Sequence, residues 1–256
     1  MSKYLKVLDV WEGNLEMNED AFAAGNVVGL IIRLNNMSGG HHVDTMFLKQ
    51  WGESQRFNPA PYFVYNPWVS GLANYNWLLS NCPKCPTVFI DTEVTMPNYP
   101  PATYGAEFDY FINLCVAKWH TVIYAGQGSL DMLTPWPKIE YWWPQWSYPL
   151  YPGPLTPKKA VTWEELDALL DKLPWPPVNS RYCDGTIRLH QCSGDRFIVP
   201  GTTRIIDVSI WPGTKEEYAT WIGWPGTPTP PPTYPPTDSQ RIARLEVQAL
   251  AHGWTL

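Results

Sequence analysis

Short apolar runs alternate with segments of helical periodicity along most of the chain. Runs rich in β-branched and aromatic residues, bounded by polar or Pro-containing segments, predict strands. The expected strands are Tyr4–Val10, Val27–Leu34, Tyr62–Tyr65, Thr87–Ile90, Thr121–Tyr124, Tyr141–Trp146, Ile187–Gln191 and Thr203–Val208. The expected helices are Asn18–Ala24, Val43–Trp51, Gly71–Leu79, Ala106–Trp119, Gly128–Leu133 and a segment from the capping box Thr162-Trp-Glu-Glu165 to Leu173.

Strands that alternate with helices predict βαβ units and a parallel sheet. The eight strands in 256 residues favour an α/β fold of the (β/α)8 type, an irregular TIM-like barrel. The irregularity is expected late in the chain, because Ser193–Gly201 is too short for a full helix. An open doubly wound sheet is the alternative, which the lack of a GxGxxG or P-loop pattern disfavours.

Composition changes sharply after the last strand. We expect the barrel to cover residues 1–223, a Pro/Thr-rich linker residues 224–237 and a C-terminal helix residues 238–256. Asp238 is a suitable N-cap, and Ile242, Leu245 and Ala249 have heptad-like spacing. So short a helix is marginal alone. Docking on the barrel and weak self-association through this helix both remain open.

Charge and hydropathy exclude several classes of protein. The net charge of −6 disfavours a grip on nucleic acid phosphates. No apolar run reaches the roughly 18 residues of a membrane span. The first ten residues lack the apolar core of a signal peptide, so we expect synthesis in the cytoplasm without one.

The five cysteines form an odd set, which fits a reducing compartment better than a disulfide framework. Cys82 and Cys85 have zinc-knuckle spacing but no second such pair, so ordinary loop thiols are favoured. His41 and His42 are adjacent and would diverge, so a solvated loop is favoured over a metal pair. We expect no metal and no cofactor.

Carboxylates follow three of the apolar runs. In a barrel the carboxyl ends of the strands carry the active site. Asp9 falls at the end of the first strand, Asp91 and Glu93 at the end of the fourth, and Asp207 at the end of the eighth. The first and eighth strands are neighbours when the barrel closes, so the four side chains are expected around one mouth.

Asp91 and Glu93 share one face of their strand, because side chains alternate with a period of two. Two close carboxylates repel each other, and one pKa rises until that group is a neutral acid near neutral pH. Glycoside hydrolysis needs this division between a protonated acid and an anion. The residues therefore predict a glycan hydrolase.

Seven segments, in order, resemble glycoside hydrolase family 25, the lysozymes (N-acetylmuramidases) that include bacteriophage endolysins. The match covers roughly residues 4–215. The segments are Leu8-Asp9-Val10-Trp11-Glu12-Gly13, Val28–Arg33, Tyr62–Pro67, Phe89-Ile-Asp91-Thr-Glu93, Val122–Tyr124, Trp142-Trp-Pro-Gln145-Trp146, and Leu189-His-Gln191 followed by Val199-Pro-Gly201 and Ile206-Asp207.

The resemblance implies a retaining, substrate-assisted muramidase. Glu93 would be the general acid/base, and Asp91 the anion that orients the N-acetyl group of the substrate. Asp9 and Asp207 would shape the site. Tyr62, Tyr124, Trp142 and Gln191 would bind the glycan, although packing in the core explains the three aromatic residues equally well. The implied substrate is peptidoglycan. The protein would act on the cell wall after its release from the cytoplasm or as a virion component.

The chain departs from the family pattern at several positions. Glu12 stands where the family has Gln, and no Glu follows the second strand, in Arg33–His42. His190 and Cys192 replace expected aromatic residues, which predicts an altered cleft floor. The alternative function is therefore a catalytically weak barrel that binds glycan or serves as a virion structural part.

Overall fold

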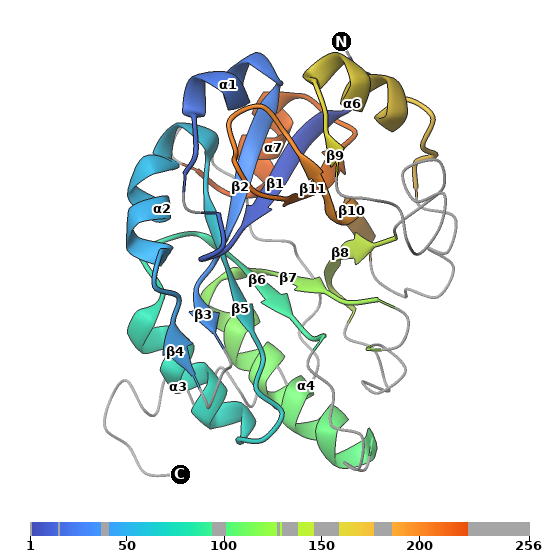
Figure 1. Cartoon of the computed structure of the whole chain (residues 1–256). Coiled ribbons are helices and arrows are strands. Elements are labelled where there is room, and N and C mark those ends of the chain that lie inside the picture. The colour runs from blue at the N-terminus through green and yellow to red at the C-terminus, as the bar shows by residue number, and fades with distance from the viewer. Residues whose placement is uncertain are drawn as a thin grey trace.

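The computed structural model describes residues 2–14, 16–36, 41–93, 101–126, 129, 138–145, 159–176 and 186–224, with only the backbone given for 101–104. Among these residues, eight strands close into one barrel (Figure 1). They are β1 (Leu5–Val10), β2 (Val27–Arg33), β5 (Ala60–Val64), β6 (Thr87–Asp91), β7 (His120–Tyr124), β8 (Glu140–Pro144), β10 (Thr186–Ile198) and β11 (Ile206–Trp211). The predicted TIM-like barrel is confirmed.

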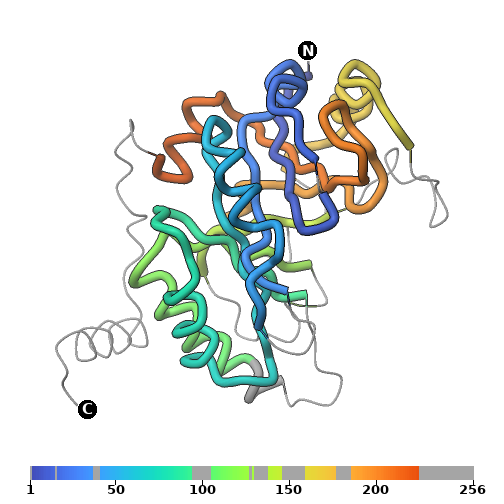
Figure 2. Tube along the Cα trace, turned by 60° about the vertical axis from the view of Figure 1, so that its left-hand side comes forward, coloured from blue at the N-terminus to red at the C-terminus, as the bar shows by residue number. Residues whose placement is uncertain are grey.

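The first seven barrel strands are parallel neighbours in chain order, and β11 closes the barrel between β10 and β1. The first and last strands of the barrel, blue and orange in Figure 2, thus lie side by side. A two-residue strand, β9 (Lys159–Ala160), adds to the far end of β10. β11 thereby pairs with both β1 and β10, the two strands that would otherwise be the edges of an open sheet.

The direction of the last strand differs from the prediction. β11 runs antiparallel to both β1 and β10, because the β10–β11 connection is a hairpin with no helix to reverse the chain. The strand also starts at Ile206, later than expected. Asp207 therefore stands near the beginning of its strand. It still reaches the mouth, since the start of an antiparallel strand lies at the carboxyl ends of its neighbours.

The helices surround the barrel. They are α1 (Glu19–Ala24), α2 (Phe47–Glu53), the 3-10 turn η1 (Gln55–Phe57), α3 (Gly71–Asn81), α4 (Pro101–Lys118), α6 (Trp163–Leu170) and α7 (Lys215–Trp221). Asn18 caps α1 as predicted, and Thr162 with Glu165 forms the predicted capping box on α6. Figure 1 shows α3 and α4 side by side. The outward side chains of the strands form one large apolar cluster with these helices other than α7.

The helix predicted for Val43–Trp51 is wrong at its start. Asn35–Asn36 (β3) and His42–Val43 (β4) pair as a small antiparallel ribbon, and α2 begins only at Phe47. The Asp44 side chain accepts hydrogen bonds from the backbone N–H groups of Met46 (2.9 Å) and Glu12 (3.0 Å). An Asp that bonds its own backbone two residues ahead favours a turn over a helix.

A helix that the sequence analysis missed closes the amino end of the barrel. Tyr218 and Trp221 of α7 pack with Trp211 in the apolar cluster that fills the barrel interior. Trp221 stacks on Trp211 with ring centroids 5.0 Å apart. Gly29 lets α7 approach, because a Cβ atom at this position would overlap the Tyr218 hydroxyl.

Part of the prediction lies outside the described residues. These parts are the helix at 128–133 apart from residue 129, the linker from 225 onward and the C-terminal helix. Trp224, which the prediction gives to the linker, donates its indole N–H to the Pro59 carbonyl at 3.0 Å, so the barrel includes it. Within the described part of the chain, no helix has both the length and the apolar character needed to cross a membrane.

Candidate active site

The four predicted carboxyl groups meet at one mouth of the barrel. Asp9 lies opposite Asp207 in the β1–β11 pairing, and Asp91 ends β6. Asp9 is buried, with 6% of its surface exposed, while Glu93 lies exposed at the rim. Each of these carboxyls has a raised pKa, and charge repulsion links Asp9 to the other three. The mouth is thus one electrostatic unit.

Gln191 ties the two sides of this mouth together. Its amide nitrogen donates to Asp9 at 2.9 Å and, at a longer 3.4 Å, to Asp207. Its amide oxygen accepts a hydrogen bond from the Tyr124 hydroxyl, with the two oxygens 2.7 Å apart. The side chain of Gln191 lies beneath the carboxyls with little exposure, 2%. We therefore see Gln191 as a spacer that holds the carboxyls and the phenol in place.

Burial is the main cause of the raised pKa values. It raises the pKa of Asp9 well above the ordinary value, helped by the negative charge of Asp207. Burial also raises the pKa of Asp91 to about 7, with Glu93 adding repulsion, and that of Asp207 to about 7. The cluster therefore retains protons at a pH where isolated carboxyls are fully ionised, as acid/base chemistry requires.

Asp91 and Glu93 differ in their surroundings. One oxygen of Asp91 accepts the backbone N–H of Glu93 at 2.8 Å, and the positive charge of Arg33 also lowers the pKa of Asp91. Both interactions favour the anionic form of Asp91. Burial raises the pKa of Glu93, while the Tyr124 hydroxyl lowers it. Glu93 thus stands at the solvent side of a partly desolvated pair.

The three predicted aromatic residues form the floor beneath the carboxyls. The Trp142 ring lies 4.4 Å from Tyr124 and 6.4 Å from Tyr62 between centroids. Its indole N–H donates to Ser209 at 2.9 Å. All three are buried. Their packing positions the carboxyls, and direct contact with a sugar stays a prediction.

No family model matches the chain, and no curated protein sequence matches it. Solved structures do. The family 25 glycosyl hydrolase from Bacillus anthracis has a TM-score of 0.60 at 18% identity, covering 85% of this chain and 94% of that chain. The fold is that of glycoside hydrolase family 25. The bacterial lysozyme from Streptomyces coelicolor has a TM-score of 0.62 at 14% identity, covering 85% and 96%. The family 25 lysozyme from Aspergillus fumigatus has a TM-score of 0.58 at 13% identity, covering 86% and 99%.

Two departures from the family 25 pattern lie elsewhere than expected. His190 and Cys192 alternate with Gln191 along β10 and so point away from the barrel interior. Cys192 packs in the outer apolar cluster, and His190 contacts the Gln145 carbonyl at 2.9 Å. The prediction that they alter the cleft floor is wrong.

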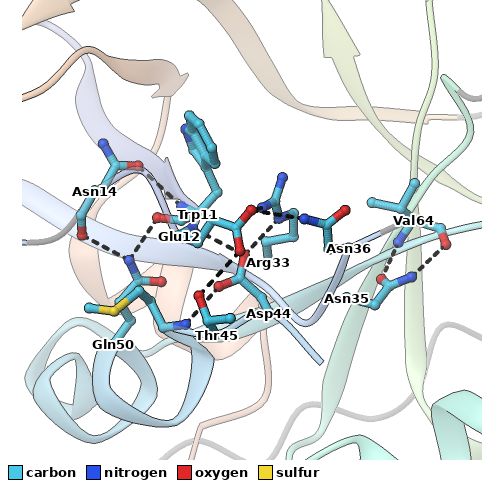
Figure 3. A network of polar contacts seen from close by, with 11 residues as sticks. Trp11, Glu12, Asn14, Arg33, Asn35, Asn36, Asp44, Thr45, Gln50 and Val64 are labelled. Atoms are coloured by element: carbon cyan, nitrogen blue, oxygen red, sulfur yellow. Dashed lines mark hydrogen bonds and ion pairs between the residues drawn. The ribbon is translucent and has the colours of Figure 1, made fainter. Parts of the chain in front are cut away.

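Sequence reasoning missed a polar network beside the mouth (Figure 3). Arg33 at the end of β2 pairs with Asp44 at 2.7 Å and with Glu12 at 3.1 Å. Asn36 and Thr45 also donate to Glu12, at 2.8 and 3.2 Å. Glu12 thus brings a second carboxylate, beside Asp44, to the segment after β2, where residues 33–42 contain no Glu. The sequence did carry a signal for this network, because the charged residue Arg33 directly follows the apolar run Val27–Ile32.

The loop histidine and the cysteine pair have structural partners. The expected solvated loop is wrong for His41. Its ring stacks on Trp77 with centroids 5.0 Å apart, and its Nε2 lies 3.0 Å from the Asn74 side-chain oxygen. The Cys82 and Cys85 sulfurs lie 3.6 Å apart as free thiols. Over the described ranges, no group of three or more His, Cys, Asp or Glu residues has a geometry that could hold a metal ion.

Proposed function

We propose that this protein is a peptidoglycan muramidase that cleaves the β-1,4 link between N-acetylmuramic acid and N-acetylglucosamine. The observation that carries the proposal is the cluster of Asp9, Asp91, Glu93 and Asp207 at one mouth of the barrel, with pKa values raised by burial. A cluster of carboxyls that shares protons at neutral pH suits glycoside hydrolysis. The lysozyme fold of the solved neighbours supports the same chemistry.

Each carboxyl has a role in the proposed mechanism. Glu93, exposed at the rim, donates a proton to the glycosidic oxygen as the bond to C1 breaks. Asp91 acts in its anionic form, which the Glu93 backbone N–H and the charge of Arg33 favour against burial. It orients the N-acetyl group of the substrate, whose oxygen closes on C1. Water then attacks C1 and displaces the acetamido oxygen while Glu93 takes its proton, and the two inversions retain the configuration at C1.

Asp9, Asp207 and Gln191 act through the catalytic pair. Asp9 is buried, and the negative charges of Asp207, Asp91 and Glu93 help to keep it protonated. Gln191 donates a hydrogen bond to Asp9 and accepts one from the Tyr124 hydroxyl, which fixes Tyr124 below Glu93. In this role they hold the site rigid before substrate arrives.

The decisive experiment compares wild type with Glu93→Gln on purified cell walls. The expected result is wall clearing by wild type and a loss of activity of at least about a hundredfold in the variant. Glu216→Gln, an exposed change in the first turn of α7 at the far end of the barrel, is the matched control. Equal digestion by wild type and Glu93→Gln would refute the proposal.

Product analysis resolves the finer claims. A muramidase leaves N-acetylmuramic acid at the new reducing end, and a retaining enzyme first releases the β-anomer, which NMR detects. A chitin or other amino-sugar polymer as the better substrate would change the substrate class while keeping the chemistry. Binding of glycan without any new reducing end would favour the alternative, a non-catalytic glycan-binding or virion structural barrel.

A further inference from the structure

A hollow of about 540 Å³ opens beside the carboxyl cluster. Trp11, Glu12, Gly13, Ile198 and residues 203–205 line it, and we call it the Trp11 pocket. Its size is within the range of pockets that hold small ligands. Trp11 follows Asp9 by two residues, and Ile205 precedes Asp207 by two. The pocket therefore continues the β1–β11 wall of the mouth outward.

Hydrogen bonds from side chains to the backbone fix the two walls of the Trp11 pocket. Asn14 donates its side-chain N–H to the Ile205 carbonyl at 2.8 Å, across the gap between the β1 loop and β11. The same Asn14 accepts the Trp11 backbone N–H at 3.1 Å. Gln50 donates to the Trp11 carbonyl at 2.9 Å. The pocket is thus held open by fixed polar contacts.

The indole of Trp11 is held in place while it faces solvent. It is 37% exposed. The Arg33 guanidinium lies 5.0 Å from its ring centroid, and a Cβ atom at Gly13 would overlap the ring. An aromatic surface fixed before binding loses little conformational entropy when a ligand stacks on it. Such a surface at the edge of an active site is suited to ligand contact.

One cation of the pocket, Arg204, is available to an anionic group of a ligand. The Glu12 carboxylate pairs with Arg33 and accepts hydrogen bonds from Asn36 and Thr45, so its oxygens are already engaged (Figure 3). Arg204 is exposed, and among the described residues no ion pair involves its guanidinium. Arginine recognises carboxylates through paired N–H donors. The pocket thus offers an indole face and a cation to one ligand.

We propose that the Trp11 pocket binds the acidic peptide that branches from the muramic acid residue of peptidoglycan. The inference rests on the proposed function. In that polymer the lactyl carboxyl is amide-linked to the peptide, so free carboxylates are carried by the peptide. A peptide beside the cleaved sugar would place its carboxylate on Arg204 and its aliphatic part on Trp11. The protein would then favour peptide-bearing glycan over bare glycan.

The test uses two substrates and three variants. Intact peptidoglycan is compared with the same glycan stripped of peptides by an amidase. On intact peptidoglycan, Trp11→Ala is expected to raise KM about tenfold. Arg204→Gln should raise it about threefold, an effect that added salt removes. On stripped glycan both variants should match wild type, and kcat should stay unchanged on either substrate. Lys84→Gln, an exposed cation in the turn before β6, is the matched control.

A binding measurement separates this inference from the proposed function. N-acetylmuramyl-L-alanyl-D-glutamate is titrated into wild type and Arg204→Gln and followed by NMR, which needs no catalysis. Wild type should bind it and the variant should bind it more weakly. Equal KM changes on both glycans, or equal binding by wild type and variant, would overturn the inference. If wild type cleaves neither glycan but still binds the muramyl peptide, the proposed function fails and the peptide pocket stands.

Discussion

Asp9 and Asp207 lie directly opposite each other on β1 and β11, two buried or half-buried carboxyls on adjacent antiparallel strands. Like charges at such positions destabilise a sheet. Gln191 donates to both of them. Their proximity raises the pKa of Asp9 beyond what burial alone does. The fold therefore carries a stability cost at this mouth whenever both groups ionise.

Asp207→Asn should stabilise the fold at high pH. Burial raises the pKa of Asp207 to about 7, above its ordinary value of 3.8. A raised carboxyl pKa means that wild-type stability falls as pH rises from about 4 to about 7. The variant removes this cost. We expect at least about 1 kcal/mol, or roughly 2–4 °C in Tm, at pH 8 and no gain at pH 4.

Thermal melts of both proteins at the two pH values check this expectation. Asp171→Asn is a control for which no gain in stability at high pH is expected. The Ser2 hydroxyl lowers the pKa of Asp171, so the ionised form of this carboxyl stabilises the fold. A gain for Asp207→Asn that is equal at both pH values would show that charge is not the cause.

Gln191→Met should lower both stability and turnover. The change removes the buried amide that accepts a hydrogen bond from the Tyr124 hydroxyl and donates one to Asp9. A buried group without a hydrogen bond costs about 1–3 kcal/mol, so we expect a loss near 2 kcal/mol in the free energy of unfolding. The looser carboxyls should also reduce kcat about tenfold. Denaturant unfolding and wall-digestion kinetics measure the two effects, and an unchanged kcat would argue against the positioning role.

Gly29→Ala should displace α7 from the barrel end. The new methyl group would overlap the Tyr218 hydroxyl, and overpacking of a core costs about 1–3 kcal/mol. We expect Tm to fall by about 4–8 °C. Gly52→Ala, in α2, meets no atom within 4 Å and should be neutral or stabilising. Equal melting of the two variants would mean that α7 does not seal the barrel as described.

Glu140→Gln should destabilise the amino end of the barrel without affecting the mouth. Glu140 accepts bonds from His120 (2.7 Å), Arg188 (2.7 Å) and Trp221 (2.6 Å). Burial opposes its charge, but these donors hold its pKa at about 2. In the variant, the amide N–H groups of Gln would point at these donors and leave at least one of them without an acceptor. We expect the free energy of unfolding to fall by about 3 kcal/mol.

The pH dependence of this loss gives a second readout. A lowered carboxyl pKa stabilises the fold above about pH 4.5, and the contribution disappears as pH falls toward 2. The gap between wild type and Glu140→Gln should therefore shrink in acid. Specific activity below the melting range should equal that of wild type. A gap of constant size from pH 7 to pH 3 would contradict the charge argument.

Much of the site could be predicted because it depends on local order. Apolar runs mark the strands, and the period of two puts Asp91 and Glu93 on one face. The capping box at Thr162 and Glu165 signals its helix, and the same signal at Thr214 and Glu217 would have revealed α7. Those features need only neighbouring residues, so they can be read from the chain itself.

Other features depend on partners far along the chain. Gln191 meets Asp9 only because β11 inserts between their strands and closes the barrel. The antiparallel direction of β11, which brings Asp207 to the mouth, follows from the β10–β11 hairpin and from the need to pair two open edges.

The sequence by itself determined the eight strands, their order and the carboxyls that follow them, because periodicity and strand ends are local properties. Tertiary structure decided what those carboxyls become. Burial raises the pKa values of the whole cluster, and repulsion from Asp207 raises that of Asp9 further. Such desolvation and charge coupling arise only when distant strands enclose the same small volume.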